Sequence, residues 1–295
     1  MSKEITKETT KAIMKEITKD QYEQLDSSFI EKQMTTKCIG KKVAYYNEVD
    51  STNVIAKQLG KKPDNHGTLV LAEQQNAGRG RLGRNWSSPK GDGIWMSLIL
   101  QPDIRIEHAS MLTLVTALAV NQGIRKVTGL NSFIKWPNDI VINGKKVCGI
   151  LTEMSTINEK LECIVIGIGI NANRDLFSEE LKITATSLKL ESGKEIERTS
   201  LIAAIMLYFE SYYGIFAKEE NLKGLIHDYN KMLINRNRQV KIIGSNSEYI
   251  GLALGINETG ALLVQTEEMI TGEKKTVIKT VMSGEVSVRG VYGYV

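Results

Sequence analysis

The sequence predicts an α+β protein, in which a mixed or antiparallel sheet flanked by helices is followed by a small β-barrel. Over most of the chain, short apolar runs that suit strands alternate with segments of helical periodicity. After about residue 235 the helical pattern ends, and short strands punctuated by glycine begin. We therefore expect an N-terminal leader at residues 1–37, a larger domain at 38–234 and the barrel at 235–295.

The individual elements follow from local patterns. Residues 1–37 are rich in Lys, Glu and Thr and predict a helical or frayed leader. Alternation near residues 42–50 predicts a strand, after which Ser51 or Thr52 can cap a helix that begins near Asn53. Further strands are expected at 68–74, 93–100, 133–142, 146–154 and 161–171, with helices at 106–127 and 199–216. The strand at 93–100 is apolar enough for burial on both faces.

Composition narrows the class of protein. The chain is 42% hydrophobic with a net charge of +4, which suits a globular protein and gives little support to nucleic-acid binding. Its three cysteines lack C-x-x-C spacing and no charged-then-apolar leader precedes Ile5, so we expect a cytoplasmic protein without disulfides. No apolar run reaches the roughly 18 residues of a membrane helix, so no membrane is expected. The three histidines lie too far apart for a zinc site, so no metal ligands are assigned.

The segment GRGRLGRNW, residues 78–86, places glycines and arginines between two predicted strands. Its glycines allow close approach of the backbone to a ligand, and its arginines offer planar forks for phosphate or carboxylate. GRGRLG also matches the dinucleotide fingerprint, but the residues that follow cannot start the helix that this fingerprint requires. An RNA-binding loop is the other alternative. We interpret the segment as an anion-binding loop.

Five segments occur in the order seen in biotin protein ligases, and the sequence resembles that family over residues 38–295. These segments are VDSTN (49–53), GRGRLGRNW (78–86), KWPND (135–139), KVCGI (146–150) and GIGIN (167–171). The segment GEVSVRG (284–290) is similar to the one that closes the family's small domain. The resemblance implies a class II synthetase-like catalytic domain, a C-terminal SH3-like barrel, and an arginine loop over the active site.

The resemblance also implies a reaction. The carboxylate of biotin would attack the α-phosphate of ATP, releasing pyrophosphate and leaving biotinyl-adenylate, whose mixed anhydride is then attacked by a lysine of a biotin carboxyl carrier protein. Biotin and ATP are both negatively charged, so nearby cations would oppose their repulsion. Both attacking groups come from substrates, so Cys148 is interpreted as a buried strand residue. Mg²⁺ is expected with ATP, held mainly by its phosphates.

Residue roles carry over from the matching motifs. The resemblance implies biotin contacts from Ser51, Thr52, Asn53, Gln75, Arg79, Gly80, Arg81 and Lys146. It implies ATP contacts from Arg84, Trp86, Asn138, Gly169, Asn171 and Arg289. Lys146, Arg81 and Asp139 are the expected catalytic residues, with Lys146 bridging the biotin carboxylate and the α-phosphate and Asp139 orienting the incoming lysine.

Several of these residues also allow a purely structural interpretation. Ser51 or Thr52 can simply cap a helix, Lys146 can be a hairpin lysine, and the arginines can lie on a solvated surface. Lys135 suits a phosphate contact and a structural position equally well.

Alternatives remain for the function. Family members that repress biotin genes carry an N-terminal winged-helix domain of roughly 60 residues, and residues 1–37 lack helix-turn-helix patterning, so we expect a ligase without repressor activity. A lipoate ligase, an RNA-binding module and a non-catalytic biotin sensor are the other candidates. The partner is expected to be the carrier protein or domain, and the protein to be a monomer or homodimer.

Overall fold

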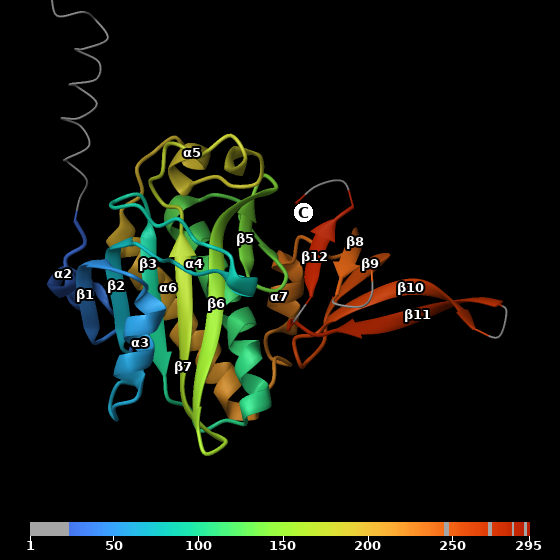
Figure 1. The fold of residues 1–295 in the computed structure, drawn as a ribbon, viewed down its shortest axis with the longest axis horizontal. Helices are drawn as coiled ribbons and strands as arrows, with labels where there is room; N and C mark the ends of the chain where they lie inside the picture. The colour runs from blue at the N-terminus through green and yellow to red at the C-terminus, as the bar shows by residue number, and fades with distance from the viewer. Residues whose placement is uncertain (1–23, 245–247, 271–272, 285, 292–293) are drawn as a thin grey trace, which may run out of the picture.

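A seven-stranded mixed sheet forms the larger domain of the computed structural model, which describes residues 24–244, 248–270, 273–284, 286–291 and 294–295 (Figure 1). The strand order is β1-β2-β3-β7-β6-β5-β4. β1 and β2 are parallel, and the other neighbouring pairs are antiparallel. The strands are β1 (Val43–Val49), β2 (Leu69–Gln75), β3 (Ile94–Leu100), β4 (Phe133–Lys135), β5 (Asp139–Ile142), β6 (Lys145–Ile157) and β7 (Lys160–Ile170). This confirms the predicted α+β class.

Each face of this sheet has its own apolar core, because successive side chains of a strand point to opposite faces. Val70, Ile99 and Val165 form a small cluster with Ala56 of α3 (Thr52–Gly60). Their neighbours along the strands belong to the main core, with α4 (Leu112–Thr128) and α6 (Arg198–Glu219). Figure 1 shows α3 on the near face and α4 and α6 behind the sheet. Every residue of β3 is buried, as its apolar density predicted.

Short helical segments complete the domain. They are α2 (Ser27–Gln33), η1 (Arg81–Gly83), η2 (Ile106–Met111), η3 (Leu181–Ile183), α5 (Leu188–Ser192) and α7 (Ile226–Met232). Asp26 caps α2 by accepting hydrogen bonds from the amides of Ser28 and Phe29. The predicted leader is therefore helical at 27–33, and its first 23 residues lie outside the described part of the chain.

The predicted strand at 133–142 is wrong in one respect, because the structure breaks it into β4 and β5 around a cis peptide bond between Trp136 and Pro137. Trp136 is buried at this break. Its backbone amide donates to Asn235 Oδ1 (2.9 Å), and its indole Nε1 donates to the carbonyl of Gly260 (3.0 Å). The break therefore fixes KWPND against the C-terminal domain.

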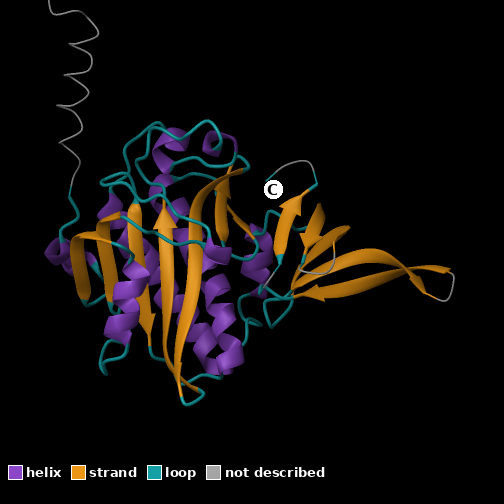
Figure 2. Cartoon of the chain, in the orientation of Figure 1, coloured by secondary structure: helices purple, strands orange, loops and turns teal. Residues whose placement is uncertain are grey.

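The C-terminal domain is a five-stranded antiparallel sheet of order β11-β10-β9-β8-β12 (Figure 2). Its strands are β8 (Gln239–Ile243), β9 (Glu248–Ile256), β10 (Leu262–Ile270), β11 (Glu273–Val281) and β12 (Ser287–Gly290). β11 and β12 end the sheet without pairing with each other in the described residues, so the strands predicted after residue 235 are present but the expected barrel is not closed. The hairpin of β10 and β11 projects away from the larger domain in Figure 2.

By length and composition alone, α6 is apolar enough to cross a membrane, so the prediction that no segment has this property is wrong. This observation is weak evidence for a membrane, because core helices of soluble proteins have the same composition. Leu201, Ile205 and Phe209 of α6 are buried in the main core of the larger domain, where the helix packs on α4. We therefore treat α6 as a core helix.

A buried ion pair joins α6 to β2 and to the N-terminal segment. Arg198 Nη1 lies 2.9 Å from Glu73 Oε2, with side chains 4% and 0% exposed. Glu73 Oε1 also accepts a hydrogen bond from the amide of Leu25 (2.6 Å). A carboxylate removed from water needs such partners, because an unpaired buried charge is strongly destabilising.

We expect Arg198→Leu to lower the free energy of unfolding by about 3–5 kcal/mol, because Glu73 would keep its charge without its cation. Urea denaturation followed by circular dichroism measures this change. Lys275→Leu is the matched control, since it removes an exposed lysine 3.9 Å from Glu273, where a change of about 0–1 kcal/mol is expected. Equal losses in the two variants would contradict the prediction.

Candidate active site

A cleft opens where the start of α3, the end of β2, the arginine loop (residues 78–86) and the glycine-containing strands β6 and β7 meet. Most of the residues predicted from the motifs lie on its walls. They are Ser51, Thr52, Asn53, Gln75, Arg79, Gly80, Arg81, Trp86, Asn138, Lys146 and Gly169. Gly149, Ile150, Gly167 and Ile168, which also line it, belong to the quoted motifs KVCGI and GIGIN, whereas the lining residues Met96 and Leu151 lie outside every motif.

One end of the cleft is polar but uncharged. Ser51 is the N-cap residue of α3, yet its side chain makes no capping hydrogen bond, which differs from the capping interpretation. The amide and hydroxyl of Thr52 both donate to Gln75 Oε1, at 2.9 and 3.1 Å. Gln75 Nε2 then donates to Ser88 Oγ (2.8 Å). These bonds fix the amide of Gln75 at the cleft wall.

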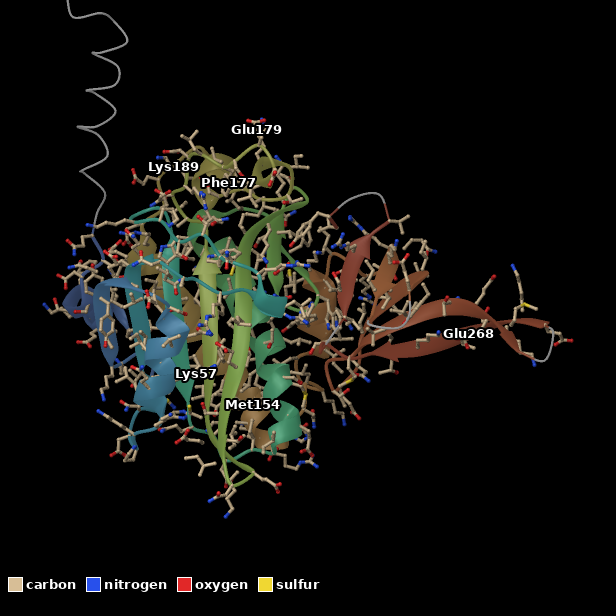
Figure 3. The ribbon with its side chains drawn as sticks, viewed as in Figure 1. Lys57, Met154, Phe177, Glu179, Lys189 and Glu268 are labelled. Atoms are coloured by element: carbon tan, nitrogen blue, oxygen red, sulfur yellow. The ribbon has the colours of Figure 1, made fainter. Side chains whose placement is uncertain are left out.

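Asn53 is fixed at the same end by partners that the motifs did not reveal. Its Oδ1 accepts from Ser97 Oγ (2.6 Å), and its Nδ2 donates to Glu153 Oε2 (2.7 Å). The other oxygen of Glu153 lies 2.5 Å from the ammonium of Lys57 on α3. Figure 3 shows Lys57 beside β7. Ser97 had a signal in the sequence, since it is the one polar residue in the buried strand IWMSLIL.

The floor of the cleft requires glycine at two positions of β7. A Cβ atom at Gly167 would overlap Asn53 Oδ1, and one at Gly169 would overlap the indole of Trp86. Trp86 therefore packs directly on the strand backbone, and its buried Nε1 has no hydrogen-bond partner in the described part of the chain. A ligand acceptor beside this nitrogen would satisfy it.

The arginine loop folds back on itself rather than opening a helix, which agrees with the rejection of the dinucleotide fingerprint. The amide of Trp86 donates to the carbonyl of Gly78 (2.9 Å), and Leu82 adopts a positive φ of 56°. Arg81 reaches out of the loop to Asn138 Oδ1 (3.0 Å) and to the carbonyls of Ser283 and Gly284 (2.5 and 2.8 Å). The loop is thereby attached to the C-terminal domain.

The other end of the cleft is strongly charged. Lys146 Nζ lies 2.5 Å from Asp139 Oδ1, and Asp139 Oδ2 accepts from the hydroxyl of Tyr294 (2.5 Å). Burial alone would raise the pKa of Asp139, but the charges of Lys146 and Lys135 outweigh it, so the pKa is lowered and the carboxylate stays ionised. Burial lowers the pKa of Lys135 to about 8, with Asp139 opposing this shift. Lys135 is buried and therefore not a simple surface lysine.

Three predicted ATP residues do not line the cleft. Asn171 is buried, and its Nδ2 donates to the carbonyl of Thr186 (3.1 Å), so its amide supports the chain after β7. Arg84 is exposed on the arginine loop, and Arg289 is exposed on β12, but both are near enough to lower the pKa of Lys135. The spacing of residues in the sequence does not show that Asn171 supports the backbone, or that Arg84 and Arg289 lie outside the cleft wall.

Cys148, which the sequence analysis placed in the core, is buried, and all three cysteines are free. Among the described residues, no group of three or more His, Cys, Asp or Glu side chains is arranged to hold a metal ion.

Comparisons with known proteins agree with this geometry. The family described as "Biotin/lipoate A/B protein ligase family" matches residues 45–171, and "Biotin protein ligase C terminal domain" matches residues 237–289. The chain is 43% identical over 250 residues to the bifunctional ligase/repressor BirA of Bacillus spizizenii, covering 83% of this chain and 76% of that protein. It is 28% identical over 221 residues to the biotin–[acetyl-CoA-carboxylase] ligase of Mycobacterium tuberculosis, covering 73% of this chain and 80% of that protein.

A solved structure shows the same likeness in three dimensions. The biotin protein ligase from Aquifex aeolicus in complex with biotin and ATP has a TM-score of 0.73 and 31% sequence identity to this chain. The likeness covers 85% of this chain and 99% of that one. The chain therefore belongs to the biotin protein ligase family.

Proposed function

We propose that this protein activates biotin with ATP, forming biotinyl-5'-AMP and pyrophosphate, and then transfers biotin to a lysine of a biotin carboxyl carrier protein. The observation that carries the proposal is the polarity of the cleft, which has fixed neutral amides at one end and a cluster of lysines around Asp139 at the other. Biotin has a matching polarity, since a neutral ureido ring and a carboxylate lie at its opposite ends.

The neutral end suits the ureido ring. Thr52, Asn53 and Gln75 are fixed before any ligand arrives, so little ordering is needed when biotin binds. The dithiolane ring of lipoate has no N–H or C=O groups and could not use the hydrogen-bonding capacity that these fixed polar groups still offer a ligand, which disfavours a lipoate ligase.

The charged end suits the reaction itself. Lys146 would contact the biotin carboxylate and the α-phosphate together, so its charge opposes their repulsion and stabilises the charge that develops in the transition state. Asp139 holds Lys146 in place, and in the second step its negative charge would attract the acceptor lysine. Arg79 and Arg81 would contact the adenylate from the loop above, and Trp86 would pack on the nucleotide.

Magnesium is expected to arrive with the phosphates of ATP. The charged end offers one carboxylate, Asp139, and both of its oxygens already face Lys146 and Tyr294, so the donor set does not fit a metal held by the protein alone. The steps above are therefore assigned to side chains. A cytoplasmic location and a monomeric or homodimeric state remain part of the proposal.

Replacing Lys146 tests the reaction directly. With ATP and Mg²⁺, wild type should add one biotin mass to a biotin carboxyl carrier domain, and lipoate should not replace biotin. Lys146→Ala should slow the transfer by about 100-fold or more, because it removes the preorganised cation. Intact-mass spectrometry of the carrier measures the rate.

Lys145→Ala is the control for this experiment, since Lys145 is the preceding residue of β6 and is absent from the cleft wall. It should stay within roughly twofold of wild type, as is usual for substitutions away from special features. Equal rates for the two variants would remove Lys146 from the mechanism, and no transfer by wild type would refute the proposed function.

Glu153→Gln tests the neutral end of the cleft. The variant loses the charge that holds Lys57 and keeps one acceptor oxygen where Asn53 and Lys57 now use two, so we expect the KM for biotin to rise about tenfold with little change in kcat. Steady-state pyrophosphate release measures both constants. Glu159→Gln, an exposed residue between β6 and β7, is the control and should behave as wild type. A fall in kcat alone would contradict the assignment.

We also propose that the protein does not repress transcription. Among residues 24–42, α2 (Ser27–Gln33) is the helix that precedes β1, and residues 1–23 lie outside the described part of the chain. The full chain, with biotin and ATP, should bind a biotin-operon operator fragment no better than a scrambled one in a mobility-shift assay. Sequence preference that persists at raised salt would contradict this.

A further inference from the structure

The C-terminal residues of the chain return to the charged end of the cleft. The hydroxyl of Tyr294 donates to Asp139 Oδ2 at 2.5 Å, and the ammonium of Lys135 lies 3.6 Å from the centre of the Tyr294 ring. One aromatic side chain therefore touches two of the three charged groups at this end. Tyr294 lies outside every motif that carries the family resemblance.

The hydroxyl completes the surroundings of Asp139. Oδ1 faces the ammonium of Lys146, and Oδ2 faces Tyr294, so the two partners lie on different oxygens and fix the plane of the carboxylate. Burial, followed by the nearby charge of Asp139, raises the pKa of Tyr294, so the phenol stays neutral and acts as the donor. Without it, a buried carboxylate oxygen would lose its directed hydrogen bond.

The ring has a separate effect on Lys135. An ammonium over an aromatic face is attracted by the ring quadrupole, while the ring also keeps water away from it. Exclusion of water strengthens the interaction between a lysine and phosphate, because the effective dielectric is lower. Lys135 also lies near Lys146, Arg84 and Arg289, whose charges lower its pKa further, although Arg84 and Arg289 are themselves exposed.

We propose that Tyr294 is a positioning residue of the active site, which orients Asp139 opposite Lys146 and shields Lys135 for contact with the phosphates of ATP. The proposal rests on the ligase function proposed above. The C-terminal domain then contributes to the site at two points, because its Ser283 and Gly284 carbonyls hold Arg81 while its Tyr294 holds Asp139.

Two variants separate the hydroxyl from the ring. Tyr294→Phe keeps the ring over Lys135 and removes the donor to Asp139, whereas Tyr294→Leu removes both. Tyr249→Phe is the matched control, since Tyr249 on β9 also lies under a lysine, with Lys279 Nζ 4.4 Å from its ring centre, but its charged neighbours Lys279 and Glu268 lie on the hairpin of β10 and β11. Biotin-dependent pyrophosphate release would be measured from about pH 6 to 10, a range that spans the pKa of about 8 of Lys135.

We expect Tyr294→Phe to lower kcat about tenfold, with the alkaline limb of its pH profile unchanged. Lys135 is required as a cation, so activity should fall as pH rises through its pKa of about 8. In Tyr294→Leu the ammonium regains water, its pKa rises, and this fall should move to higher pH together with a higher KM for ATP. If Tyr294 had only a structural role, the two variants would not differ from each other in kcat, pH profile and KM in this way.

A second measurement does not depend on biotin. The ε-carbon resonance of Lys135 in ¹³C-lysine-labelled full-length protein, assigned with Lys135→Arg, should titrate near 8 in wild type and in Tyr294→Phe, and higher in Tyr294→Leu. If wild type releases no pyrophosphate while this pattern holds, the proposed ligase function is refuted, but the effect of the Tyr294 ring on Lys135 is still supported.

Three results would overturn the proposal. The first is Tyr294 variants that match wild type and Tyr249→Phe in kcat and pH profile. The second is a lysine titration that Tyr294→Leu leaves unchanged. The third is a lower KM for ATP in Tyr294→Leu, which would show that the ring blocks the nucleotide site and does not shield Lys135 for contact with the phosphates.

Discussion

The burial of Trp136 between the two domains is the constraint on which the cleft depends. Its indole and backbone amide each donate a hydrogen bond to the C-terminal half of the chain. Asn138 and Asp139 follow within three residues, so their positions are set by this anchor rather than by the sheet alone. Arg81 then bonds to Asn138 and to the C-terminal domain, which brings the arginine loop to the same place. The charged end is therefore a property of both domains together.

The two ends of the cleft are built by different kinds of interaction. The neutral end uses hydrogen bonds between fixed polar groups, and the charges of Glu153 and Lys57 pair with each other behind Asn53. The other end concentrates lysines around a single carboxylate, whose pKa is lowered by them. Such a division favours a substrate that is polar and neutral at one end and anionic at the other.

Local motifs predicted most of the cleft from the sequence, because each places several residues on one turn or strand. The motifs failed where position depends on distant partners. Asn171 belongs to a motif, but its amide is used to support the backbone near Thr186. Glu153 and Tyr294 bond to Asn53 and Asp139 through packing between elements, which no local pattern encodes. Their roles became visible only in three dimensions, whereas Ser97 was marked by its polarity in a buried strand.

The fold was predictable to a similar degree. The spacing of apolar residues predicted the sheet and the helices that flank it, because this spacing reflects which face of each strand or helix is buried. The break at Trp136 was missed because the apolar runs on both sides of KWPND each predict strand, while Trp136 packs on the C-terminal part of the chain. Closure of the C-terminal sheet was overestimated because glycine-punctuated strands predict curvature but not which edges meet.

The shared carboxylate of Glu73 has a mechanical consequence. It holds the amide of Leu25 and the guanidinium of Arg198 at once, and it lies two residues before Gln75 on β2. A displacement of the chain at Leu25 is therefore transmitted to β2, the strand that carries Gln75, while the bonds of Gln24 to Tyr45 and Asn47 transmit it to β1. The position of this segment is coupled in this way to a wall of the cleft.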